Sequence, residues 1–177
     1  TNIKYKGMTS CISKALKYMN DCQNEDGGFG YSDPKNNHAE GYYSLTGVGM
    51  LCNQMWGRGN QSEVRKGAKY ILENTKFDFN TEFCDLYGHY YESQAMMQRG
   101  GDDWKKYNDI FRDQLLANQD ADGSWKEPGG KAPKLRAAGA MFKTDKTYRT
   151  TLCILMLEVY YRFLATSGGG ARERSGI

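Results

Sequence analysis

The chain has 177 residues, of which 39% are hydrophobic and 25% are charged, a composition that is ordinary for a soluble globular protein of one domain. Its formal charge of +3 is small and evenly spread, which argues against a nucleic-acid-binding face of clustered Lys and Arg. No apolar stretch approaches the roughly 20 residues that a membrane span requires.

A helical pattern of apolar residues recurs six times along the chain. It covers residues 9–22, 39–55, 62–74, 81–98, 104–118 and 147–164. The first, third and fifth segments are amphipathic, whereas the second, fourth and sixth are apolar or rich in rings and are expected to be buried. Thr9 or Ser10 is available to cap the first helix, and Asp102 or Asp103 to cap the fifth. This alternation predicts helical hairpins, each with an outer and an inner helix.

A short segment appears twice, each time directly after an amphipathic helix. Residues 23–29 read Gln-Asn-Glu-Asp-Gly-Gly-Phe, and residues 119–125 read Gln-Asp-Ala-Asp-Gly-Ser-Trp. Each copy is typical of a helix end that turns through Gly and then places an aromatic ring. Two copies indicate a repeat protein, because one hairpin alone cannot bury its apolar face. We expect an all-α, α/α toroid-like array of about three hairpins, as half a ring or an open array, over residues 1–166, and a flexible tail at 167–177.

These two segments resemble the QW motif of the terpenoid cyclases and protein prenyltransferases. Residues 111–125 match it closely, residues 23–29 carry Phe in place of Trp, and the middle repeat at 70–79 lacks it. The resemblance, which runs from residue 9 to 165, implies an α/α toroid. It also implies that the motif is structural, its Gln bonding a neighbouring helix end and its ring stacking there. The residues concerned are Gln23, Asp26, Gly27, Phe29, Gln119, Asp122, Gly123 and Trp125.

The resemblance also implies two possible sets of catalytic groups. Squalene-type cyclases start with an Asp-x-Asp-Asp motif, in which a carboxylic acid protonates an alkene, and the chain has no such segment. Protein prenyltransferases hold Zn²⁺ with Asp, Cys and His, but here Glu40, Tyr42 and Gly88 stand at the three ligand positions. The sequence therefore predicts no catalytic residue, no metal ligand and no cofactor, with zinc as the alternative.

A shifted zinc site is that alternative. His89 stands one place beyond the expected ligand position and four residues after Asp85, so the two share a helix face, and Glu40, His38 or Cys84 would complete the set. The competing interpretation is that Asp85 simply accepts the imidazole proton. The chain has only two His, which disfavours a three-ligand site.

The inner helices are unusually rich in tyrosine, of which the chain has 13. Their rings would line a cavity, and the residues expected to touch a ligand there are Tyr42, Tyr43, Asp85, Tyr87, His89, Tyr91 and Tyr148. We expect a repeat domain that is non-catalytic by itself and binds an apolar, isoprenoid-like molecule or a partner chain. The alternative is part of an isoprenoid cyclase or prenyltransferase whose remaining catalytic residues lie outside this chain.

The expected partners follow from the same features. They are an apolar small molecule, a second copy of the chain, or the other half of a longer parent chain, because three hairpins make about half of a closed ring. The chain opens without Met inside an apparent repeat, which suggests a fragment. A cytoplasmic location is expected, since no signal segment and no membrane span is visible.

Overall fold

The computed structural model describes residues 5–33, 45–129 and 140–162, which form helices joined by turns and loops, with no strand among them. The helices are α1 (Met8–Asp21), α2 (Thr46–Met55), α3 (Ser62–Asn74), α4 (Leu86–Arg99), α5 (Gly101–Ala117) and α6 (Lys146–Arg162), with a short 3-10 helix, η2 (Ala140–Lys143), before the last. This confirms the prediction of an all-α protein with six helices. Two isolated antiparallel bridges, Gln23 to Phe29 and Gln119 to Trp125, lie within the repeated segments.

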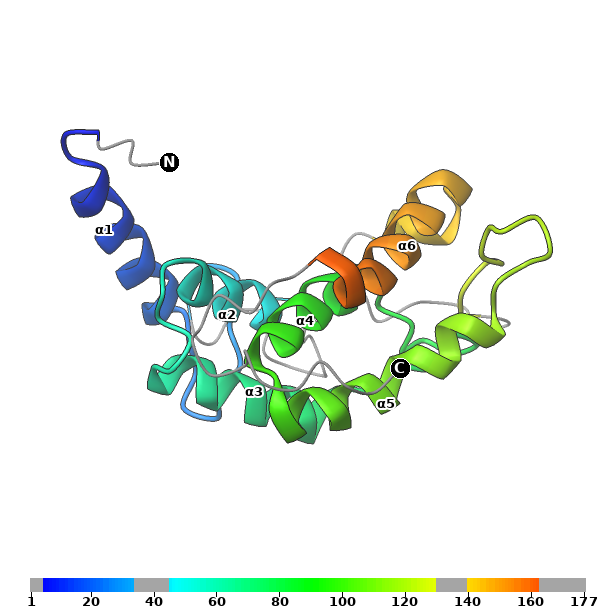
Figure 1. Ribbon diagram of the computed structural model, residues 1–177, viewed down its shortest axis with the longest axis horizontal. Coiled ribbons are helices and arrows are strands. Elements are labelled where there is room, and N and C mark those ends of the chain that lie inside the picture. Colours follow the sequence, from blue (N-terminus) through cyan, green and yellow to red (C-terminus); the bar gives the residue numbers. More distant parts are fainter. Residues whose placement is uncertain (1–4, 34–44, 130–139, 163–177) are drawn as a thin grey trace.

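The helices form two layers (Figure 1). In one layer α4 packs between α2 and α6, and in the other α3 packs beside α5. The second layer contacts the first through α2 and α4, while α1 packs on α2 and projects from one end of the array. None of the helices in the described ranges is both long enough and apolar enough to cross a lipid bilayer.

The start of α1 differs from the sequence prediction. The residue at its N-cap is Gly7, whose φ of 84° is left-handed, so Thr9 and Ser10 lie inside the helix and neither caps it. A glycine adopts this conformation without the steric penalty of a side chain, and it ends the preceding turn two residues before Thr9, the first of the expected caps.

The starts of α4 and α5 also differ from the prediction. α4 begins at Leu86 rather than at residue 81, because the Asp85 carboxylate accepts a hydrogen bond from the Gly88 amide at 3.0 Å and caps the helix there. α5 begins at Gly101, so Asp102 and Asp103 lie in its first turn and are not its caps. Their negative charges still favour the helix by lying at the positive end of its dipole. Residues 39–44, 163–164 and the predicted tail at 167–177 lie outside the described residues.

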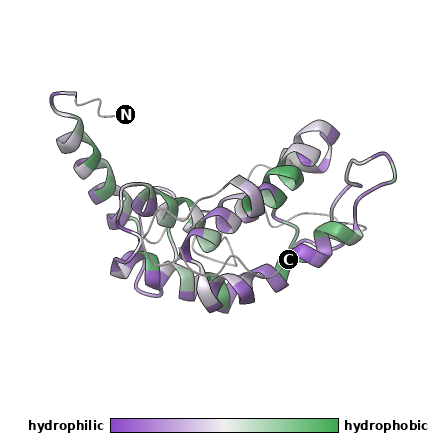
Figure 2. Cartoon of the chain, viewed as in Figure 1, coloured by the Kyte–Doolittle hydropathy of each residue, from purple (hydrophilic) through white to green (hydrophobic). Residues whose placement is uncertain are grey.

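The core lies between the two layers. It includes the predicted apolar face of α3, where Val64, Ala68 and Ile71 are buried, and Leu72 packs at its margin. The inner helices supply Met50, Leu86, Ala95, Met96 and Met156. Figure 2 shows that hydrophobic and hydrophilic residues alternate along the helices. Helix α3 has one side for this core and one for solvent, whereas no residue of α4 is exposed.

Two glycines of α2 allow its close contacts. A Cβ atom on Gly47 would lie 2.5 Å from the backbone nitrogen of Glu92, so α2 and α4 touch backbone to backbone at this point. A Cβ atom on Gly49 would lie 2.4 Å from the Phe29 ring. Both distances are far below van der Waals contact. Gly47 therefore lets α2 lie close to α4, and Gly49 lets it lie close to the first repeated segment.

Candidate functional site

The first repeated segment contacts three helices. The Gln23 side-chain amide donates two hydrogen bonds, to the Gly27 carbonyl at 2.9 Å and to the Glu63 carbonyl in the first turn of α3 at 2.8 Å. The Phe29 ring is buried against α2, and its amide donates to the Thr46 hydroxyl at 3.2 Å. The segment thereby joins the end of α1 to both α2 and α3.

The second repeated segment joins α5 to α6. The buried Trp125 indole donates to the Leu115 carbonyl of α5 at 2.8 Å, and the Trp125 carbonyl accepts from the Arg149 guanidinium of α6 at 2.9 Å. Asp122 adds an ion pair with Lys146 at 2.8 Å. In each copy the Asp caps its own turn, Asp26 by accepting from the Gly28 amide and Asp122 from the Ser124 amide. All eight motif residues therefore lie in turns and helix contacts.

Four tyrosines gather near the starts of α4 and α6, and we call Tyr87, Tyr90, Tyr91 and Tyr148 the tyrosine cluster. The rings of Tyr87 and Tyr91 meet edge to face at a centroid distance of 5.1 Å, and those of Tyr90 and Tyr91 at 4.8 Å. Burial raises the pKa of Tyr91 to about 12, with a further contribution from a hydrogen bond to Tyr87. Burial also raises the pKa of Tyr148, and Tyr87 adds to that effect. The hydroxyls of Tyr91 and Tyr148 are therefore uncharged at neutral pH.

The predicted ligand contacts divide into three groups. Tyr87, Tyr91 and Tyr148 come together in the tyrosine cluster, and Asp85 caps the start of α4, two residues before Tyr87. Tyr42 and Tyr43 lie outside the described residues. His89 lies on the other side of α4, roughly 160° around the helix from Tyr87 and Tyr91.

His89 is part of the core between α4, α5 and the segment after α3. Its Nε2 lies 3.3 Å from the Lys76 carbonyl, which can only accept, so Nε2 carries the proton and Nδ1 accepts from the Tyr107 hydroxyl at 2.8 Å. Burial lowers the pKa of His89 to about 4. The imidazole is thus neutral at pH 7, and neither nitrogen is left for a metal ion or for Asp85. Within the described residues, no three His, Cys, Asp or Glu side chains are placed to hold a metal ion.

Glu92 lies next to His89 and was not anticipated from the sequence. It is buried, its Oε1 accepts from the Thr75 hydroxyl at 3.3 Å, and its Oε2 has no hydrogen-bond partner among the described residues and lies 3.8 Å from His89 Nδ1. Burial, reinforced by Asp85, raises the pKa of Glu92 well above its usual range. The available signal was an acid three residues after His89 on a helix that the sequence predicted to be buried.

No protein-family model, no curated protein and no solved structure matches this chain. The resemblance to terpenoid cyclases and prenyltransferases therefore stays a prediction from the repeated motif.

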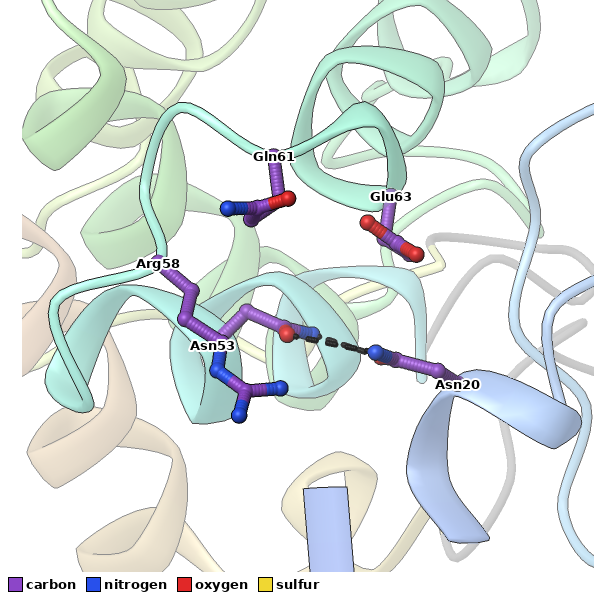
Figure 3. A pocket seen from close by; sticks show the side chains of 5 residues that line it. All are labelled: Asn20, Asn53, Arg58, Gln61 and Glu63. Atoms are coloured by element: carbon purple, nitrogen blue, oxygen red, sulfur yellow. Dashed lines mark hydrogen bonds between the residues drawn. The ribbon is translucent and has the colours of Figure 1, made fainter. Parts of the chain in front are cut away.

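A polar pocket of about 290 Å³ opens where the end of α1 meets α2 and the start of α3 (Figure 3). Its lining residues are Asn20, Asn53, Arg58, Gln61 and Glu63. The amides of Asn20 and Asn53 donate to each other, at 3.4 and 2.8 Å, and hold α1 against α2. Nothing in the spacing of these residues along the sequence marks them as a group, because they meet only through the packing of three helices. Their polarity does not suit an apolar ligand.

The two sides of α4 have different chemical capacities. The tyrosine cluster presents ring faces, which attract apolar groups and cations, and carries hydroxyls that can donate or accept a hydrogen bond. The acid with the raised pKa, Glu92, belongs to the opposite side, enclosed with His89, Thr75 and Tyr107. The arrangement therefore suits binding at the tyrosine cluster better than proton donation there.

Proposed function

We propose that the chain is a terpenoid cyclase- or prenyltransferase-like repeat domain that binds an apolar, isoprenoid-like ligand. The layer of α2, α4 and α6 would form the inner wall of an α/α toroid-type array, and the ligand would lie on the tyrosine cluster. The observation that carries this proposal is that Tyr87, Tyr90 and Tyr91 pack together and that Tyr148, from the neighbouring helix α6, packs on the same core.

The physical support comes from how these rings are held. They are half-buried and packed edge to face, so part of each ring remains accessible while its orientation is fixed. Ordered rings lose little conformational entropy when a ligand covers them. An isoprenoid chain offers branched apolar carbon and double bonds, both of which pack well on aromatic faces.

Binding without catalysis is favoured by the position of the ionisable groups. Neither His89 nor Glu92 points toward the tyrosine cluster, and burial lowers the pKa of His89 and raises that of Glu92, which in each case favours the neutral form. If incubation with a prenyl diphosphate and a divalent metal gave a hydrocarbon or alcohol product, the enzyme alternative would replace this proposal.

Replacing Tyr91 tests the ligand site. We expect Tyr91→Ala to raise the dissociation constant for a C15 prenyl alcohol about tenfold, since a lost aromatic contact is worth about 0.5–1.5 kcal/mol beyond its area. Tyr91→Phe should bind nearly as well as the wild type, because the ring face and not the hydroxyl makes the contact. Calorimetric titration measures both constants.

The matched control is Tyr161→Ala, which removes a ring that is 88% exposed at the far end of α6. It should leave the dissociation constant unchanged. Equal affinities for Tyr91→Ala and Tyr161→Ala would show that the ligand lies elsewhere, and capture of a protein partner that is lost in Tyr91→Ala would favour a partner chain on this layer.

A further inference from the structure

The two copies of the repeated motif differ in one respect that their sequences do not show. Gln23 uses both N–H groups of its amide, one on the Gly27 carbonyl and one on the Glu63 carbonyl of α3. Its counterpart Gln119 is exposed and bonds the Gly123 carbonyl at 3.0 Å, with no second acceptor among the described residues. The second N–H of the Gln119 amide therefore has no helix carbonyl to bind among the described residues.

The glycines of the two copies show the same difference. A Cβ atom on Gly27 would lie 2.3 Å from the Lys66 carbonyl oxygen of α3, whereas a Cβ atom on Gly123 would meet nothing within 4 Å. Both glycines have a left-handed φ, 104° and 84°, so the backbone of the two turns is alike. The first turn is covered by the start of an outer helix, and the second is open.

The two copies also differ at the position three residues before the Gln. Asn20, three residues before Gln23, lines the pocket together with Gln61 and Glu63 at the start of α3. Leu116, three residues before Gln119, is 54% exposed. We call Leu116, Gln119 and Gly123 the α5 edge. Gln119 and Gly123 correspond to Gln23 and Gly27, which contact the start of α3 in the first copy. Leu116 places an apolar side chain where the first copy has the Asn20 amide.

The helix that matches this edge is α1, at the opposite end of the array (Figure 1). Met8, Cys11, Ala15 and Tyr18 are exposed and recur at intervals of three and four residues, so they form one line on its surface, which we call the α1 stripe. On α3, the comparable outer helix, the residues Val64, Ala68 and Ile71 at the same kind of spacing are buried. The α1 stripe is thus an apolar surface of the kind that outer helices bury in this fold.

The charges at the two ends are also complementary. α1 and the turn before it carry the exposed cations Lys6 and Lys14. The second half of α5 and the turn after it carry the exposed carboxylates Asp109, Asp113 and Asp120, of which Asp113 is paired with Arg112, while the exposed Lys105 and Lys106 lie toward the start of α5. Opposite charges at the rim of an interface favour one orientation of approach over others.

We propose that the α5 edge binds the first turns of α1 from a second copy of this chain, head to tail. Leu116 packs on the α1 stripe, Gln119 donates its second N–H to a carbonyl in the first turn of the partner helix, and the open backbone at Gly123 lets that helix approach. This interaction repeats between two chains the contact that Gln23 and Gly27 make with α3 within one chain, and it does not depend on which ligand the tyrosine cluster binds.

Sedimentation of the full chain at concentrations from about 1 µM to about 1 mM tests this proposal. We expect the mass of two or more copies at the upper end. Ala15→Arg, on the α1 stripe, and Leu116→Arg, on the α5 edge, should each raise the dissociation constant at least tenfold. Both residues are exposed, so the variants should keep the wild-type helical circular dichroism spectrum. Met55→Arg, at an exposed position of α2 outside both surfaces, is the control and should associate as the wild type does.

A mixing experiment separates head-to-tail pairing from other contacts. Each variant keeps one intact surface, so an equimolar mixture of Ala15→Arg and Leu116→Arg should associate although neither does alone. A wild-type chain that stays monomeric throughout the range would overturn the proposal. So would a mixture that stays monomeric, because it holds one intact copy of each surface. A Leu116→Arg variant that associates as the wild type does would also overturn it, because this is the result of a symmetric contact between two α1 helices.

Discussion

Gly27→Ala is expected to destabilise the protein by several kcal/mol, and Gly123→Ala by much less, although the two glycines hold the same place in two copies of one motif. Both have a left-handed φ, so an alanine at either position costs about 1–2 kcal/mol. At Gly27 the new methyl group would also lie 2.3 Å from the Lys66 carbonyl oxygen and 2.6 Å from its carbon. Relieving that overlap requires moving the backbone of α3, which adds about 1–3 kcal/mol.

Urea unfolding of the two variants beside the wild type measures this difference directly. Because the strain of the left-handed backbone is common to both, the difference between their free energies of unfolding isolates the contact of the first segment with α3. Equal losses of stability in the two variants would contradict the account, since they would mean that α3 does not press on Gly27 in solution.

Glu92→Gln is expected to stabilise the protein above neutral pH. Burial holds the pKa of Glu92 well above its value in the unfolded chain, so from about pH 4.5 upward the folded state keeps a proton that the unfolded state releases. Stability therefore falls as the pH rises, by about 1.4 kcal/mol per pH unit until the folded pKa is passed. A glutamine keeps the size of the side chain and has no proton to lose, so this loss disappears.

His89 acts in the opposite direction over a lower pH range. Its folded pKa of about 4 lies below the unfolded value of 6.5, so stability falls as the pH drops from about 6.5 toward 4. Between about pH 4.5 and 6.5 the two effects oppose each other in the wild type, and above about 6.5 only that of Glu92 remains.

Urea unfolding at a series of pH values from about 5 to 9 distinguishes these contributions. The wild type should lose stability above about pH 6.5, whereas Glu92→Gln should stay level there and weaken only toward acid pH, where His89 acts. Glu73→Gln, an exposed carboxylate on α3, is the control and should follow the wild type. A Glu92→Gln curve that runs parallel to the wild-type curve above pH 6.5 would show that Glu92 is already ionised in the folded protein.

The all-α class and the six helices could be predicted from the sequence because the helices are periodic. Six apolar patterns gave six helices, and the face of α3 that holds Val64 and Ile71 was identified correctly. The helix starts were read less well. Sequence alone does not distinguish between neighbouring candidates for an N-cap. In the structure the N-cap residues are Gly7 for α1, Asp85 for α4 and Gly100 for α5.

The site was less predictable, because its contacts join distant parts of the chain. Helical spacing shows that Tyr87 and Tyr91 share a side of α4 that His89 does not, but it cannot say which side meets α5. The partners of His89, the Tyr107 hydroxyl and the Lys76 carbonyl, lie on other elements and carry no local signal. The open edge at Gln119 is likewise invisible in the motif, which reads alike in both copies, and emerges only when their surroundings are compared.

Photolabelling with a prenyl alcohol analogue that carries a benzophenone group tests most directly whether the tyrosine cluster is a ligand site. After irradiation and proteolysis, the label should lie on peptides from the starts of α4 and α6, around Tyr87, Tyr91 and Tyr148, and excess unlabelled prenyl alcohol should prevent it. Labelling that is confined to peptides of α3 and α5, or that excess alcohol does not reduce, would contradict the account, because the ligand would then lie on the outer layer or bind without a site.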